Sequence, residues 1–410
     1  MVPSFISTLF QQRYDLGVHL PFQLIRYVDI FHHVFGNIIL LIFRLFPINP
    51  NKIVIANLKG SGYGCNPKYI VDILAKEIPT YDLVWLILDK NQEEKQMPES
   101  VRRVNYYSIQ AIYELATARV WIRNIMCALD LGKRQNQLYI QTWHGSGPKK
   151  AGVVTSKEST RKYQYFFKCL NCRINVVLSC SKYQTRVFRE GFLYSGPILE
   201  CGFPRNDIFY QNNKELAISV KKRLNLKPDK KYVLYAPTFR NDLQLGILEL
   251  DYSGIINACH IRFGGEWILL GRLHPSLAIK YSEIFVGAEN IIDVSQYPDM
   301  QELLLISDIL ITDYSSSMFD YALTQRPCYL YIPDIAAYVQ NRGLYMDLDT
   351  LPFPSAETNL GLVDKITKFD AERYHADLMK FFEDYGVVDD GTASSQVVDY
   401  IRKYFMTNNF

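Results

Sequence analysis

The sequence predicts an α/β protein built from two consecutive domains, each organised around a parallel β-sheet. The chain has 410 residues, which is long for one ordinary hydrophobic core and suits two domains. Short β-branched runs alternate with helical segments, a pattern typical of parallel sheets with crossover helices. This series of strands occurs twice, with a break near residues 211–231. At 48% hydrophobic and 21% charged residues, the composition is that of a globular protein.

Each predicted strand is a short apolar run that leads into a loop and a helical stretch. The first series is Ile53–Ala56, Leu83–Leu88, Val120–Arg123, Leu138–Thr142 and Val176–Ser179. The second series is Tyr232–Tyr235, Trp267–Gly271, Ile291–Asp293, Ile309–Thr312 and Cys328–Tyr331. Two doubly wound, Rossmann-like halves joined by a linker describe the GT-B arrangement, in which a ligand binds at the strand carboxyl ends of two facing domains. We therefore expect domains at residues 47–215 and 216–410, with the terminal helices in the second.

Residues 1–46 differ from the rest of the chain because they are apolar but interrupted. The unbroken apolar run Ile38–Phe43 is far shorter than the ~20 residues that span a bilayer. Asp29, His32 and His33 interrupt the longer window. We expect an amphipathic helix that lies on a membrane surface. A helix that only caps the first domain is the alternative.

Positive charge is concentrated in one part of the chain, although the net charge is only +3. Between Lys133 and Glu190 there are twelve Lys or Arg residues, and the acidic residues are Glu158 and Glu190. Such a stretch attracts anionic lipid, a phosphate polymer or nucleic acid. A solvated basic face with no partner is the alternative interpretation.

Two common kinds of site do not match the sequence. Gly60, Gly62 and Gly64 follow the first predicted strand, but they do not complete the G-x-G-x-x-G fingerprint of a dinucleotide site. Cys169 and Cys172 form a lone C-x-x-C without a second pair at zinc-finger spacing. We therefore predict no dinucleotide cofactor and no metal ion.

The strongest candidate for catalysis is a turn that follows the strand ending at Thr142. Its sequence is Trp-His-Gly-Ser-Gly-Pro-Lys-Lys, from Trp143 to Lys150. Glycines permit a tight turn that presents His144, whose imidazole titrates near neutral pH and is suited to take a proton from a hydroxyl. The residues predicted to contact the acceptor or a phosphate group are Gly145, Ser146, Lys149 and Lys150.

Polar groups follow several other predicted strands, where they would meet an anionic ligand. Gly202–Asp207 and Tyr235–Arg240 each place an arginine, Arg205 and Arg240, just past a turn, and a guanidinium matches phosphate oxygens. The segment Gly271–Pro275 adds Arg272 and His274.

A further strand runs directly into hydroxyl groups in the segment Ile311–Asp320. Ser315 and Ser316 would begin a helix there, where free N–H groups favour a diphosphate. Asp320 is one turn further along, within reach of a ribose hydroxyl. Simple N-capping by serine is the alternative for one of these residues.

With these motifs in order, the chain from about Arg44 to about Tyr385 resembles the CDP-glycerol glycerophosphotransferase family, which includes teichoic acid primases and polymerases and related capsule enzymes. The resemblance is carried by the Trp-His-Gly turn, Gly-x-Pro-Arg-Asn-Asp, Ala-Pro-Thr-x-Arg, Arg-x-His-Pro and Thr-Asp-Tyr-Ser-Ser. It implies a GT-B fold, a membrane-associated amino-terminal region and a first domain for the acceptor with a second for the donor. It also implies transfer of polyol phosphate from a CDP-polyol with release of CMP.

The resemblance also implies roles for individual residues. His144 is the candidate base, and His274, the second catalytic candidate, contacts the diphosphate together with Arg272. The positions expected to bind the donor are Arg205, Pro237, Thr238, Arg240, Arg272, His274, Ser315, Ser316 and Asp320. The chain carries Ser146-Gly147-Pro148 where Thr-Pro-Leu is commoner in the family, which leaves the acceptor open.

The function that we expect is transfer of polyol phosphate, in the first place glycerol phosphate from CDP-glycerol, to a hydroxyl of a cell-envelope polymer or lipid-linked primer in teichoic acid or capsule synthesis. The enzyme would work without a cofactor or nucleic acid, peripherally on the cytoplasmic face of the membrane. A GT-B glycosyltransferase that uses a nucleotide sugar is the alternative activity. A non-catalytic protein that binds membranes or polyanions is the alternative of another class. The sequence leaves open glycerol or ribitol, primase or polymerase, and the oligomeric state.

Overall fold

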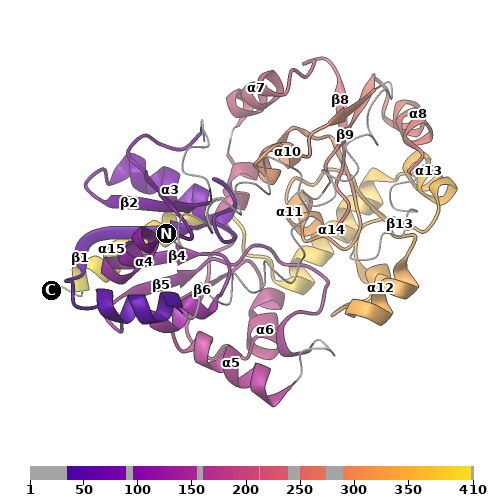
Figure 1. Cartoon of the computed structure of the whole chain (residues 1–410). Helices are drawn as coiled ribbons and strands as arrows, with labels where there is room; N and C mark the ends of the chain where they lie inside the picture. Colours follow the sequence, from indigo (N-terminus) through magenta and orange to yellow (C-terminus); the bar gives the residue numbers. More distant parts are fainter. Residues whose placement is uncertain are drawn as a thin grey trace. The chain divides into compact units, whose positions relative to one another are not determined.

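The computed structural model describes residues 35–88, 96–154, 160–211, 213–238, 250–273 and 290–407. These residues form two compact units (Figure 1). Unit 1 holds the described residues of Met1–His144, Thr160–Asp207 and Val388–Phe410, and unit 2 holds those of Gly145–Ser159 and Ile208–Val387. Each unit is built on one parallel sheet, as the repeated strand series predicts.

Unit 1 contains a seven-stranded sheet in the order β3-β2-β1-β4-β5-β6-β7. The first strand lies inside the sheet and the chain winds outward from it in both directions, which makes the unit doubly wound. Its strands are β1 (Asn49–Ala56), β2 (Asp82–Ile87), β3 (Arg102–Asn105), β4 (Ala118–Arg123), β5 (Leu138–Gln141), β6 (Val176–Ser179) and β7 (Ile198–Glu200). Its helices include α3 (Cys65–Glu77), α4 (Ile109–Thr117), α5 (Arg161–Asn171), α6 (Lys182–Gly191), α15 (Ala393–Thr407) and the 3₁₀ segment η1 (Ala128–Gly132).

Unit 2 repeats the same plan with six parallel strands in the order β10-β9-β8-β11-β12-β13. Its strands are β8 (Lys231–Tyr235), β9 (Trp267–Gly271), β10 (Ile291–Asp293), β11 (Ile309–Thr312), β12 (Cys328–Tyr331) and β13 (Ser355–Ala356). Its helices include α7 (Lys214–Arg223), α8 (Tyr252–Phe263), α10 (Met300–Ile306), α11 (Ser317–Ala322), α12 (Ile335–Arg342), α13 (Asn359–Thr367) and α14 (Ala371–Tyr385). Their apolar side chains form one core with the strands, because each central strand is buried on both faces.

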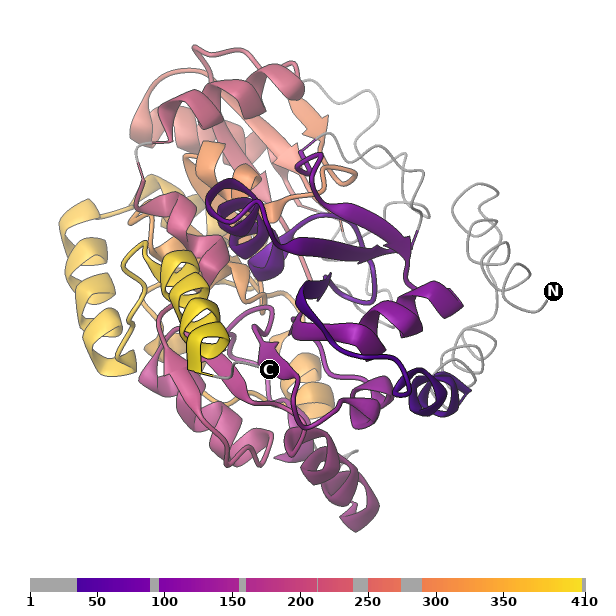
Figure 2. The ribbon, with the colours of Figure 1, turned by 90° about the vertical axis from the view of Figure 1, so that its left-hand side faces the viewer.

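The observed units differ from the expected domain boundaries at two places. The carboxyl-terminal helix α15, expected in the second domain, belongs to unit 1, and Figure 2 shows it as the yellow helix near the C label. Its Val397, Val398 and Ile401 share a core with α3 and the first sheet. Residues 145–154, expected in the first domain, pack with unit 2. The main boundary, between Asp207 and Ile208, lies close to the predicted one at residue 215.

All ten predicted strands are present, and three strands were missed. The missed strands β3, β7 and β13 are two to four residues long and lie at sheet edges. Edge strands are half-solvated and short, so they lack the continuous apolar run that identifies a central parallel strand.

Of the predicted amphipathic segment at 1–46, residues 1–34 lie outside the described part, and residues 35–43 are helical. Leu40 is fully buried, and Asn37 Nδ2 donates to the Ala128 carbonyl at 3.0 Å, so this helix packs on η1. None of the described helices is both long enough and apolar enough to cross a bilayer. Packing on unit 1 matches the expected alternative, while the predicted contact with a membrane stays a prediction.

Candidate functional site

The His144 turn begins where β5 ends and is shaped by unusual backbone angles. Trp143 has a φ of 56°, a left-handed conformation that costs a non-glycine residue about 1–2 kcal/mol, and Gly145 has a φ of 142°. The Trp143 indole packs against Phe192 at a ring-centroid distance of 4.6 Å. The bend places the His144 imidazole so that Nδ1 lies 2.7 Å from the Asn124 carbonyl oxygen, which follows the neighbouring strand β4.

This contact determines which ring nitrogen of His144 can act as a base. A carbonyl oxygen only accepts hydrogen bonds, so Nδ1 carries the proton and Nε2 keeps its lone pair. Burial lowers the pKa of His144; the bond to Asn124 opposes this shift, and the positive charge of Arg205 lowers the pKa further. The imidazole is therefore neutral at neutral pH, the protonation state that a general base requires.

Arg205, predicted to bind the donor, contacts the His144 turn. It is 6% exposed, and its Nη1 donates to the His144 carbonyl oxygen at 2.8 Å. The backbone N–H of Arg205 donates to Asn66 Oδ1 at 3.1 Å, and Asn66 Nδ2 in turn donates to the carbonyls of Thr142 and Trp143. Arg205, from the segment after β7, and Asn66, from α3, therefore both hold the turn.

The remainder of the Gly-Phe-Pro-Arg-Asn-Asp motif binds the carboxyl-terminal segment. Phe203 N and Asn206 Nδ2 donate to Asp389 Oδ1 at 3.0 and 3.1 Å. Asp207 accepts from the N–H groups of Ala393 and Ser394, the first residues of α15. We conclude that this motif is mainly structural, and that only Arg205 within it faces the His144 turn.

Sequence reasoning missed two asparagines that lie at the switch point of unit 1, between β1 and β4. Asn124 Nδ2 donates to Asn57 Oδ1 at 2.7 Å, and Leu58 N donates to Asn124 Oδ1 at 2.8 Å. The Asn124 carbonyl accepts the hydrogen bond from His144 Nδ1. Both asparagines directly follow a buried strand, the same signal that identified His144, and could have been found by it.

The loop that follows His144 packs with unit 2 and carries the predicted acceptor residues. Gly147 lies against Ser316, so closely that a Cβ at Gly147 would be 3.4 Å from the Cα of Ser316. Lys149 forms an isolated antiparallel bridge with Leu344, and Lys150 N donates to the Gly343 carbonyl at 3.1 Å. Ser146 is buried, whereas the side chain of Lys150 is exposed.

In unit 2 the predicted donor residues gather at the carboxyl ends of three adjacent strands, β9, β8 and β11. Thr238, after β8, donates through its hydroxyl and its N–H to the Asp313 carboxylate, after β11. Tyr314 N also donates to Asp313, at 2.6 Å. Pro237 is buried beside Thr238. Asp313 therefore joins two strand ends at the switch point of the second sheet, where doubly wound folds bind their ligands.

Arg272, after β9, has the properties of an anion-binding residue. Its Nη1 is buried and has no hydrogen-bond partner among the described residues. Burial lowers its pKa to about 10, although Asp299 and Tyr297 oppose the shift. A guanidinium remains charged at that value, and a buried cationic donor without a partner is costly unless an anion binds it.

The hydroxyl cluster after β11 is only partly what the sequence predicts. Ser315, rather than Ser316, bonds to the helix start, since its Oγ receives the N–H and the hydroxyl of Ser317 at 3.3 and 2.9 Å. Helix α11 has only six residues, so its dipole is short. Asp320 is 4% exposed and accepts from Gln301 Nε2 of α10 at 3.1 Å. The predicted contact of Asp320 with a ribose stays a prediction.

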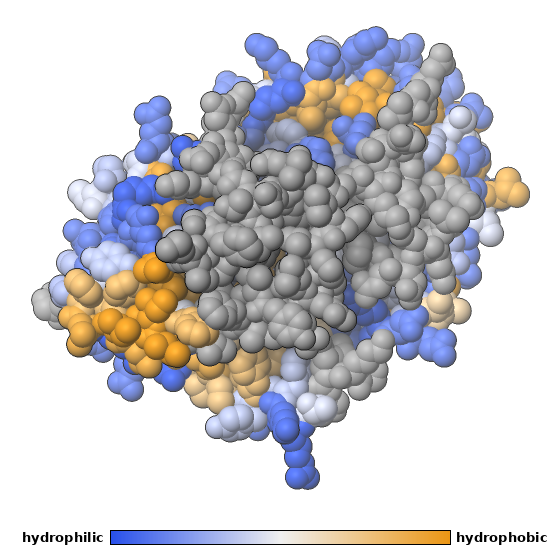
Figure 3. All heavy atoms as spheres, in the orientation of Figure 1, coloured by the Kyte–Doolittle hydropathy of each residue, from blue (hydrophilic) through white to orange (hydrophobic). Residues whose placement is uncertain are grey.

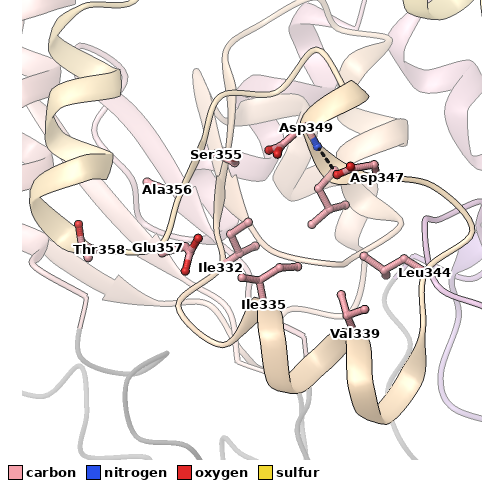
Figure 4. A pocket seen from close by; sticks show the side chains of 11 residues that line it. Ile332, Ile335, Val339, Leu344, Asp347, Asp349, Ser355, Ala356, Glu357 and Thr358 are labelled. Carbon is pink, nitrogen blue, oxygen red and sulfur yellow. Dashed lines mark hydrogen bonds between the residues drawn. The ribbon is translucent and has the colours of Figure 1, made fainter.

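Two predicted residues, Arg240 and His274, lie outside the described part of the chain. In the described ranges, no group of three or more His, Cys, Asp or Glu side chains could hold a metal ion. A pocket of about 300 Å³ lies beside β12 and β13, with Ile332, Ile335 and Leu344 on its wall and Asp347 at its rim (Figure 4). It contains none of the predicted site residues.

Comparison with known proteins agrees with the family that the sequence motifs predict. Residues 38–403 match the model of the family described as CDP-Glycerol:Poly(glycerophosphate) glycerophosphotransferase. A teichoic acid poly(glycerol phosphate) polymerase of Staphylococcus epidermidis is 34% identical over 87% of this chain and 51% of its own length. One of Bacillus spizizenii is 31% identical over 88% of this chain and 95% of its own length. This chain therefore spans about half of the first relative and nearly all of the second.

Solved structures give the same result. The wall teichoic acid polymerase TagF superposes with a TM-score of 0.80 and 31% identity, over 95% of this chain and 100% of that chain. TagF has also been solved with single histidines replaced and after soaking with CDPG. The family match and the TagF likeness confirm the predicted family: the chain belongs to the CDP-glycerol:poly(glycerophosphate) glycerophosphotransferase family.

Proposed function

We propose that the protein transfers glycerol phosphate from CDP-glycerol to a hydroxyl of a teichoic acid chain or primer, with release of CMP. Family membership over residues 38–403 carries this proposal, because it supplies the class of donor and of reaction. The polymerase names of the relatives and the CDPG soak of TagF support glycerol phosphate as the transferred unit. The predicted GT-B arrangement is part of the proposal and is supported by two sheets with the same doubly wound strand order.

The two units would divide the chemistry between them. In unit 2, Arg272, with Thr238 and Ser315 at the neighbouring strand ends, would hold the diphosphate. In unit 1, Nε2 of His144 would take the proton of the acceptor hydroxyl. The hydroxyl oxygen then forms a bond to the phosphorus that carries glycerol, and the bond from that phosphorus to the CMP oxygen breaks. Charge increases on the departing phosphate, so a buried guanidinium would stabilise the transition state.

Peripheral membrane attachment is the second part of the proposal, and it is supported by an exposed apolar stripe. Ile38, Leu41 and Ile42 lie on one face of the helix at 35–43, Leu45 lies in the turn that follows, and these four side chains are 52–85% exposed. Figure 3 shows orange surface at the lower left, over the segment at 35–46. An apolar stripe of this kind on a soluble surface marks a contact with a membrane or a protein. A lipid-linked acceptor makes the membrane the better candidate.

A donor screen tests the proposed activity. The purified chain is incubated with a lipid-linked glycerol phosphate primer and with CDP-glycerol, CDP-ribitol or a nucleotide sugar. The products are identified by mass spectrometry. We expect CMP release from CDP-glycerol and a primer extended by glycerol phosphate units. Release of a nucleoside diphosphate from a sugar donor would favour the glycosyltransferase alternative. No turnover of any donor would favour a non-catalytic binding protein.

A further inference from the structure

A buried polar network in unit 1 ends at the His144 turn, and the reaction described above does not use it. Its centre is Asp130, which is 1% exposed and forms an ion pair with Arg123, the last residue of β4. The other carboxylate oxygen, Oδ2, accepts from Tyr139 Oη at 3.0 Å and from Cys127 N at 2.9 Å. Asp130 therefore links β4 to β5, the two strands whose ends place Asn124 and His144.

From Tyr139 the network continues to the backbone beside His144 through Gln141. Gln141 Nε2 donates to Tyr139 Oη at 3.0 Å, and Gln141 Oε1 accepts from Trp143 N at 3.1 Å. The neighbouring groups define the orientation of the Gln141 amide. The Tyr139 hydroxyl donates its hydrogen to the Asp130 carboxylate, so it can only accept from Gln141 Nε2. The Trp143 N–H can only donate, so it bonds to Gln141 Oε1. Gln141 and Tyr139 are 1% and 0% exposed, so no water competes for these bonds.

We propose that Gln141 is a positioning residue for His144: its amide, anchored through Tyr139 on Asp130, holds Trp143 in the left-handed conformation that turns the imidazole onto the Asn124 carbonyl. Trp143 is strained at its φ of 56° and needs a neighbour that maintains this angle. The same carboxylate also fixes Arg123, and the carbonyl of the next residue, Asn124, accepts the hydrogen bond from His144 Nδ1. One buried anion thus positions both partners of the histidine bond.

This inference rests on the proposed role of His144 as the base, and it predicts an effect that a merely structural residue would not have. Replacing Gln141 by methionine keeps the volume but removes the acceptor for Trp143 N. The part-buried imidazole would loosen and gain water. The charged group that faces the ring is Arg205, from the segment after β7, while Asn124 faces it from β4 and the Trp143 ring lies beside it. Since Arg205 is unchanged in the variant, regained solvation would raise the pKa of His144.

The test uses two buried glutamines of unit 1 that differ in their contact with the turn. Gln137 is 0% exposed and donates to the carbonyls of Leu115 and Ala118, away from His144. Gln137→Met is therefore the matched control for Gln141→Met. We expect Gln141→Met to lower kcat about tenfold, because a misplaced base is costly, with KM for CDP-glycerol unchanged within about twofold. We expect Gln137→Met to change kcat by less than about twofold.

Two further measurements make the outcome decisive. Titration of ¹³C-labelled histidine by NMR, with His144 assigned from His144→Gln, should show a higher pKa for His144 in Gln141→Met and no change in Gln137→Met. Tyr139→Phe, a milder variant, should act in the same direction, and adding it to Gln141→Met should cause no further loss of kcat. Equal effects of both glutamine substitutions on His144 would overturn the positioning role. An inactive wild-type chain would instead contradict the proposed function, and the NMR titration would still decide the role of Gln141.

Discussion

At the scale of single residues, the candidate site contains side chains that stabilise the fold and a side chain that is suited to bind a ligand. Arg205 and Asp320, both predicted to bind the donor, are engaged by a backbone carbonyl and by a glutamine amide. Arg272 differs, because no hydrogen bond joins its side chain to the residues that the structure describes, and its Nη1 is buried. A buried cationic donor without a hydrogen-bond partner destabilises a fold unless an anion binds it, which points to a binding role for Arg272.

Arg272→Gln should therefore weaken the binding of CDP-glycerol without weakening the fold. A hydrogen bond to a charged group contributes roughly 1.5–3 kcal/mol, so we expect the Kd to rise about 10- to 100-fold. Arg326→Gln is the control, since Arg326 Nη1 donates to the carbonyls of Leu305 and Ser307 in the same unit. Calorimetric titration should show weaker binding of CDP-glycerol for Arg272→Gln only. Urea unfolding should show a lower free energy of unfolding for Arg326→Gln only. A loss of stability in Arg272→Gln with unchanged affinity would show that Arg272 is structural.

At the scale of elements, the predicted strand bounds were most accurate where the burial of apolar side chains determines the structure. The strands β6, β9, β10, β11 and β12 have the predicted bounds. All five are short apolar runs, and all except the edge strand β10 are buried. The edge strands β3, β7 and β13 and the place of α15 could not be predicted, because they depend on tertiary contacts between distant segments. The pattern around α15 is helical but does not specify which sheet it covers.

The same limit applies to the site. A polar residue after a buried strand identified His144, Arg272, Thr238 and Ser315, because strand ends of parallel sheets are the usual sites of ligands. Whether such a residue faces a ligand or another loop depends on partners far along the chain. Arg205 and Asp207 illustrate this: one lies against the turn that follows β5, and the other caps a helix 186 residues further on.

Asp207→Ala tests the structural role of the Gly-Phe-Pro-Arg-Asn-Asp motif. Asp207 accepts from two N–H groups at the start of α15, and the loss of such a cap costs about 1–2 kcal/mol. We expect the free energy of unfolding to fall by that amount, with KM for CDP-glycerol unchanged. Asp251→Ala, which removes a cap of α8 in unit 2, is the control. A large rise in KM for Asp207→Ala alone would assign the motif to donor binding.

At the scale of the whole molecule, we expect the protein to work on a membrane surface, which it would contact through a small apolar stripe. Replacing Leu41 and Leu45 by glutamate places two charges on that stripe. Burying an apolar side chain contributes about 1.5–3 kcal/mol, so we expect sedimentation with anionic vesicles to fall at least about tenfold. The control is the pair Ile218→Glu and Ile261→Glu, two isoleucines of unit 2 with 68% and 64% exposure.

A chain that begins at Asn49 should behave like the Leu41 and Leu45 variant, and high salt should reduce the remaining attraction to anionic vesicles. If both substituted pairs bind vesicles like the wild type, the segment at 35–46 serves only to cap unit 1.

We propose that unit 1 supplies the base and that unit 2 binds the diphosphate of the donor, and His144→Gln tests this proposal most directly. CDP-glycerol binding is measured by calorimetry, and transfer is followed by CMP release across pH. Because the pKa of His144 is lowered, the neutral base persists as the pH falls, so the acid limb of wild-type kcat/KM should lie below the ordinary histidine value of about 6.5. We predict that His144→Gln binds CDP-glycerol within about twofold of the wild type, loses transfer by at least about a hundredfold, and has no such acid limb. Loss of donor affinity together with turnover, or full transfer by the variant, would contradict the account.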